Sequence, residues 1–98
     1  MATSIIPNPT KMLLKSGSVS LTFGSEEPIG ISLGDLGITY PIGYTMFSVV
    51  QANTNNGSIM LRGIGRAGNT TDNMCWFRNI STSEKTATAT IVVAFMPI

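Results

Sequence analysis

The C-terminal stretch TATATIVVAFMPI, residues 86–98, alternates between threonine and alanine and then becomes strongly apolar. In an extended chain, successive side chains point to opposite faces of a sheet, so a period of two indicates a half-buried β-strand. One face of this strand would be apolar, with Ala87, Ala89, Ile91, Val93 and Phe95 opposite Thr86, Thr88 and Thr90. The stretch is therefore predicted to be a long strand that packs one face against a core.

The same alternation recurs upstream, between segments rich in glycine, asparagine and serine, whereas helix signals are nearly absent. The further predicted strands are SVSLTF (18–23), IGISL (29–33), YTMFSVVQ (44–51), SIMLRGIG (58–65) and MCWFRNI (74–80). Short strands with turn signals about every 8 to 12 residues are typical of an antiparallel sandwich or small barrel. We expect an all-β fold, a six-stranded antiparallel β-sandwich, over residues 18–98, preceded by an N-terminal linker or edge segment at 1–17.

Two local patterns predict finer detail. The YTMFSVVQ stretch is apolar on both faces, which predicts a strand covered on two sides. Asn56-Gly57 predicts a hairpin turn, because both residue types tolerate a positive φ. Chain length suits a single domain. The N-terminus lacks the apolar run of a signal peptide, and no stretch approaches the length of a membrane span, so membrane insertion is not expected.

Composition excludes several classes of function. Charged residues make up 11% of the chain, less than half the usual share of about 25%. The net charge of +1 comes from six basic and five acidic residues spread along the sequence, which provides no field for nucleic acid. Histidine, the commonest general base and metal ligand, is absent. The single cysteine, Cys75, cannot form a disulfide within the chain.

No pattern predicts catalysis, a metal or a cofactor. Cys75 precedes Trp76 and Phe77, which favours a buried and inert thiol. Glu26 and Glu27 are adjacent, so on a strand or tight turn they point to different sides and cannot flank one glycosidic bond. Oxygen-bearing residues near 69–73 lack the spacing of a calcium loop and are better explained as loop caps. The protein is therefore expected not to be an enzyme.

The stretch NMCWFRN, residues 73–79, holds the only tryptophan. As a strand it would place Met74, Trp76, Arg78 and Ile80 on one face and Cys75, Phe77 and Asn79 on the other. A Trp–Arg pair can stack on a sugar ring and donate hydrogen bonds to its hydroxyls, or it can form a subunit contact, or it can simply pack. Arg62 and Arg66 should project alike from the preceding strand, with Met60 and Ile64 on their face. The candidate ligand-binding residues are Trp76, Arg78, Arg62 and Asn79.

Two longer pieces carry a family resemblance. These are LGITYPIGYTMFSVVQANT (36–54) and CWFRNISTSEKTATATIVVAFMPI (75–98), and their order is similar to that in the H-type lectins and in the related C-terminal head domains of bacteriophage tail fibres. The resemblance implies a six-stranded antiparallel β-sandwich that forms a trimer and recognises carbohydrate near subunit boundaries. Trp76 or Arg78 would match an aromatic position near the end of the fifth strand. The histidine of some lectin members has no counterpart, which favours the tail-fibre form.

The expected function is thus a phage-type receptor-binding domain, a homotrimer on the virion or outside the cell, that recognises a bacterial surface glycan without catalysis. It would also contact other virion proteins. One alternative is a structural virion or assembly protein, such as a capsid decoration or baseplate component, that binds no ligand. The other is a free H-type lectin.

Overall fold

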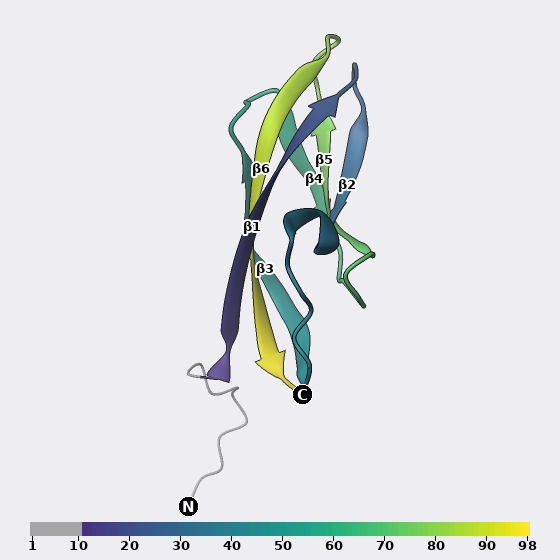
Figure 1. The fold of residues 1–98 in the computed structure, drawn as a ribbon. Helices are drawn as coiled ribbons and strands as arrows, with labels where there is room; N and C mark the ends of the chain where they lie inside the picture. Colours follow the sequence, from purple (N-terminus) through teal and green to yellow (C-terminus); the bar gives the residue numbers. More distant parts are fainter. Residues whose placement is uncertain (1–10) are drawn as a thin grey trace, which may run out of the picture.

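The structure, a computed structural model, describes residues 11–98. The chain is all-β and forms two antiparallel sheets of three strands each, packed face to face (Figure 1). The strands are β1 (Leu13–Phe23), β2 (Pro28–Ser32), β3 (Tyr44–Thr54), β4 (Ile59–Ile64), β5 (Asn73–Asn79) and β6 (Lys85–Pro97). The predicted fold class and all the predicted strands are confirmed. No helix within residues 11–98 is long and apolar enough to cross a membrane.

The long sheet has the order β1-β6-β3, so the last strand of the chain is its central strand. The predicted alternation of β6 is confirmed, because its alternate apolar residues from Ala87 to Phe95 are all buried. On the outer face, serine and threonine hydroxyls of β1 and β6 pair across the strands. These hydrogen bonds join Ser18 to Thr90 (3.0 Å), Ser20 to Thr88 (2.9 Å) and Thr22 to Thr86 (3.2 Å). Such cross-strand pairs help to fix the register of the two strands.

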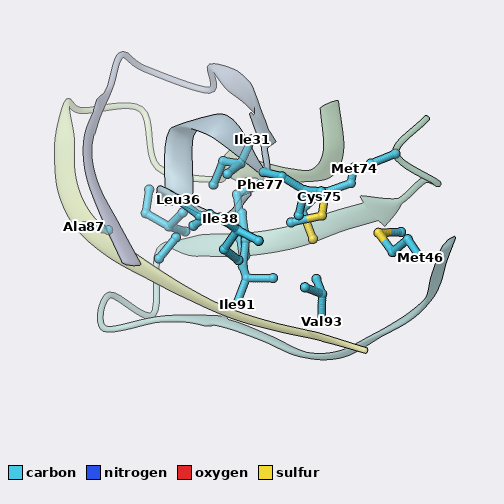
Figure 2. Packing of buried hydrophobic residues seen from close by; sticks show 14 of the residues in the cluster. Ile31, Leu36, Ile38, Met46, Met74, Cys75, Phe77, Ala87, Ile91 and Val93 are labelled. Carbon is cyan, nitrogen blue, oxygen red and sulfur yellow. The ribbon is translucent and has the colours of Figure 1, made fainter. Parts of the chain in front are cut away.

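The short sheet has the order β2-β5-β4, and its inner face meets the long sheet. Figure 2 shows Ile91 and Val93 of β6 pointing towards Cys75 and Phe77 of β5. All four side chains are at most 1% exposed. The core is therefore made by the centres of the two sheets, and Cys75 is buried as predicted.

The long sheet extends well beyond the short one (Figure 1), which gives the molecule extents of 60 × 23 × 17 Å. The segment that joins β2 to β3 covers part of this extension. It contains a single turn of 3-10 helix, η2 (Gly34–Leu36), and buries Leu33, Leu36 and Ile38. Further along, the Tyr40 ring packs edge-on against Phe95 with centroids 5.3 Å apart. The crossover segment thus closes the side of the sandwich formed by the edges of β1 and β2.

β1 begins at Leu13, so residues 13–17 of the predicted linker or edge segment belong to an edge strand, and its residues 1–10 lie outside the described residues. Two other predicted details differ from the structure. β3 is an edge strand rather than a strand covered on two sides, and its register with β6 shifts at Phe47 and at Val50, which are 56% and 54% exposed. The 55–58 turn joins strands of different sheets, so it closes no hairpin, and neither Asn56 nor Gly57 has a positive φ.

Candidate ligand-binding site

Trp76 lies on the outer face of the short sheet, in its central strand β5. Its register partners are glycines on both sides, Gly30 of β2 and Gly63 of β4. The indole lies against Gly30, because a Cβ atom built on that residue would be 2.8 Å from the ring atom Cζ2. A Cβ atom built on Gly63 would meet nothing within 4 Å. The tryptophan therefore leans towards β2 and leaves open space above β4.

This space is a hollow lined by Arg62, Gly63 and Trp76, with a volume of about 330 Å³. We call it the Trp76 hollow. Its floor includes Gly63, which has no side chain to fill it, and the indole, 37% exposed, borders it. Arg62 lines the hollow at a β-bulge. The register of β4 against β5 shifts between Leu61 and Gly63, which makes Arg62 an extra residue in β4. Bulges re-aim side chains at sheet edges, and here the bulge supplies a cation beside an aromatic ring.

The chemistry of the Trp76 hollow suits a sugar. An indole face binds the apolar face of a pyranose ring, and a guanidinium group offers fork-shaped donors to hydroxyl or carboxylate oxygens. Within residues 11–98 no group of three or more acidic, cysteine or histidine side chains could hold a metal ion. Burial raises the pKa of the Cys75 thiol above its ordinary value, so it remains protonated and is a poor nucleophile. The Trp76 hollow thus combines open space, an aromatic ring and a guanidinium donor.

Arg78 shares the outer face with Trp76 but does not line the hollow. Its Nε donates a hydrogen bond to the Glu26 carbonyl oxygen over 3.1 Å, and a terminal nitrogen lies 3.8 Å from a Glu26 carboxylate oxygen. Both side chains are about half exposed, so the ion pair adds little stability. The interaction holds Arg78 against the turn between β1 and β2, away from Gly63.

Asn79 is a structural residue, and its prediction as a ligand-binding residue needs correction. Its side chain is 0% exposed and all its hydrogen bonds are internal. The amide nitrogen donates to the carbonyl oxygens of Gly24 (3.0 Å) and Ser83 (2.8 Å), and the amide oxygen accepts a hydrogen bond from the Ser81 backbone (2.9 Å). The residue ties the end of β5 to two loops and has no surface for a ligand.

Register shifts also overturn two predicted faces. Met74 was expected beside Trp76, but it is fully buried, because β5 has an extra residue opposite Ile31 and Ser32 at this point. Ile64 was expected on the face of Met60. Met60 pairs with outward-facing Arg78, whereas Ile64 pairs with buried Cys75, so the bulge at Arg62 turns Ile64 to the inner face.

Arg66 lies beyond the end of β4 and donates a hydrogen bond to the Thr45 hydroxyl of β3 over 3.1 Å. It therefore does not project with Arg62. Of the predicted site residues, only Trp76 and Arg62 come together. The residue that sequence reasoning missed is Gly63, which looks like an ordinary strand glycine until its pairing with Trp76 is known.

Comparison of the chain with protein-family models, with curated proteins and with solved structures finds no match.

Proposed function

We propose that this chain is a non-catalytic receptor-binding domain of the phage tail-fibre type, which binds a bacterial cell-surface glycan in the Trp76 hollow. The observation that carries the proposal is the open space at Gly63 beside an exposed tryptophan and an arginine. An exposed aromatic ring at the centre of a sheet face has no role in the chain's own core. The family resemblance of residues 36–54 and 75–98 supports the same class of ligand.

Location on the virion and assembly as a homotrimer belong to the same proposal. One small hollow contacts little of a sugar, so a single site would bind weakly. Three sites carried on one fibre raise the effective concentration of each site for a surface that displays many copies of the glycan.

The test begins with an array of bacterial surface glycans, probed with the fluorescently labelled chain. Trp76 is the only tryptophan, so its intrinsic fluorescence reports on the hollow alone when a glycan hit is titrated. We expect saturable binding with a change in Trp76 emission. Emission that stays constant while the glycan binds would place the site elsewhere.

A matched pair of variants tests the hollow itself. Gly63→Val is expected to fill the open space at little cost to the fold, because nothing lies within 4 Å of its Cβ position. Gly57→Val is the control, since its Cβ position is equally free but lies in a turn. We expect Gly63→Val to lose at least tenfold in affinity while Gly57→Val binds as the parent chain does. Equal affinity of all three proteins would overturn the proposed site.

A structural virion or assembly protein is the second candidate. It is favoured by the exposed apolar residues of the two edge strands β3 and β4, which include Phe47, Leu61 and Ile64. A stable assembly that binds no glycan on the array would support this second function.

A further inference from the structure

The two sides of the sandwich are closed to different extents. On the side of β1 and β2, the crossover segment fills the gap between the sheets and buries Leu33 and Leu36. This contact is close, because a Cβ atom built on Gly17 of β1 would lie 2.8 Å from the Leu36 side chain. On the side of β3 and β4, the 55–58 turn joins the two strands and Arg66 contacts Thr45, yet apolar side chains of both strands stay exposed. We call these the closed side and the open side.

Core-type side chains are exposed on the open side. Leu61 and Ile64 pair with the buried residues Phe77 and Cys75, so they lie on the inner face of β4, yet they are 42% and 54% exposed. Phe47 of β3 is 56% exposed. Phe47 and Ile64 line a groove of about 400 Å³ that also includes the core residue Met46. The groove thus borders the hydrophobic core at Met46.

The distribution of charge indicates what occupies the open side. β3 and β4 contain no carboxylate, and the charged side chains here are Arg62 of β4 and Arg66 just beyond its end. The closed side carries the exposed carboxylates of Glu27 and Asp35. It also carries one cation, Lys15, whose Nζ donates a hydrogen bond to the Thr39 carbonyl oxygen of the crossover segment, so carboxylates are in excess there. Two open sides facing each other would bring like charges together, whereas an open side facing a closed side pairs opposite charges. When identical chains contact each other through two different surfaces, they form a closed ring if the rotation from one chain to the next divides a full turn evenly.

Strand addition is a poor mode for this contact. The free edge of β3 is interrupted by register shifts at Phe47 and Val50, and bulges of this kind block the continuous ladder of hydrogen bonds that an added strand needs. Side-chain packing onto the groove is the remaining mode. Packing of this kind would bury the exposed apolar side chains of the open side, and exposed apolar patches commonly mark such interaction sites.

The open side adjoins the Trp76 hollow, because Arg62 and Gly63 belong to β4, the outermost strand of the short sheet. Only three residues line the hollow, whereas ligand sites usually enclose most of a ligand's surface. Within residues 11–98 no strand follows β4 in its sheet, so this sheet supplies no wall for the hollow beyond the free β4 edge. We infer that a second copy of this chain docks its closed side on the open side and thereby supplies the absent wall of the hollow. The part of this inference that concerns the hollow rests on the proposed function.

The first measurement is the mass of the full-length chain in solution, by size exclusion with light scattering. We expect a closed oligomer for the parent chain and for Met60→Glu, whose side chain is 51% exposed on the outer face of β4. We expect monomers for Phe47→Glu and for Ile64→Glu, with circular dichroism spectra like that of the parent. A monomeric parent chain, dissociation of Met60→Glu, or a parent-like mass for folded Phe47→Glu and Ile64→Glu would each overturn the inference.

The second measurement separates this inference from the proposed function. The monomeric variants keep Arg62, Gly63 and Trp76, so we expect them to bind a glycan hit at least tenfold more weakly per site, by Trp76 fluorescence. Unchanged affinity in a monomer would show that the hollow needs no second copy. If the parent chain binds no glycan but dissociates as described, the proposed function fails and the docking surface stands.

Discussion

At the scale of single residues, β5 contains an exposed tryptophan and a buried asparagine within four positions, and the two have different roles. The Trp76 side chain faces outward and makes no hydrogen bond within residues 11–98. The Asn79 side chain faces inward and its hydrogen bonds join the end of β5 to the loops around it. The two residue types would be read alike in a search for sugar-binding groups, since aromatic and amide side chains both contact sugars. Only burial distinguishes them, and it follows from the face of the strand.

The amide of Asn79 predicts a clear change in stability. Alanine at this position leaves the Ser83 carbonyl oxygen without its donor and the Ser81 N–H without its acceptor, and leaving buried polar groups unpaired costs about 1–3 kcal/mol. We expect Asn79→Ala to lower the free energy of unfolding by that amount in a urea titration. Trp76→Ala is the comparison, and it should lose ligand binding with a much smaller loss of stability. Similar stabilities for Asn79→Ala and the parent would contradict the structural role.

The buried thiol of Cys75 predicts a pH dependence. Below its ordinary pKa of 9.0 the thiol is protonated in both the folded and the unfolded chain, so it adds no slope. Above pH 9, the unfolded chain loses the proton while burial keeps it on the folded chain, so the free energy of unfolding falls as pH rises. We expect the parent chain to lose more stability than Cys75→Ala between pH 8 and 10, measured by urea denaturation at each pH.

A thiol reagent provides an independent check of the same burial. Cys75 should react with a disulfide probe at the rate of global unfolding in water and rapidly in urea. Fast reaction under native conditions would show that the thiol is accessible and would remove the basis for the pH effect.

At the scale of strands, the alternation of polar and apolar residues locates the strands of both sheets, apart from the first five residues of β1. This pattern is local, since each residue's face depends on its neighbours along the chain. The bulges at Arg62 and Met74 could not be found in this way, because a bulge is defined by the partner strand. For the same reason Gly30 and Gly63 gave no signal. They matter only because the register places them on either side of Trp76.

The contact between β1 and η2 predicts the most sensitive glycine of the fold. A Cβ atom on Gly17 would overlap the Leu36 backbone and side chain, which cannot move without shifting the crossover segment. We expect Gly17→Ala to destabilise the chain by about 1–3 kcal/mol, the usual cost of overpacking. Gly57→Ala is the matched control and should have an effect below about 0.5 kcal/mol. Thermal unfolding followed by circular dichroism checks both, and equal midpoints would mean that β1 and η2 are not in close contact.

At the scale of the whole molecule, the fold depends on its last strand. β6 lies between β1 and β3, and the hydrogen bond between Ser18 and Thr90 joins residues 72 positions apart. The long sheet therefore cannot form until nearly the whole chain is present. By contrast, every strand of the short sheet lies within residues 28–79. The sequence pattern identifies β6 as a strand, but not as a central one, because order within a sheet is set by pairing between distant segments.

This order predicts the result of removing β6. A chain of residues 1–84 keeps all strands of the short sheet but loses the pairings of β6 with β1 and β3, along with the buried row from Ala87 to Phe95. The inner face of the short sheet, including Phe77, would then be open to water, and three strands with one uncovered apolar face gain too little from burial to offset the loss of chain entropy. We expect the 1–84 chain to be unfolded, with Trp76 emission at the wavelength of a solvated indole and a one-dimensional proton spectrum without dispersed methyl signals. The control is a chain of residues 1–97, which lacks only the exposed Ile98 and should give the dispersed spectrum of the parent. Dispersed methyl signals from the 1–84 chain would instead mean that the short sheet is stable without the long one, and the two sheets would then be independent folding units rather than halves of one core.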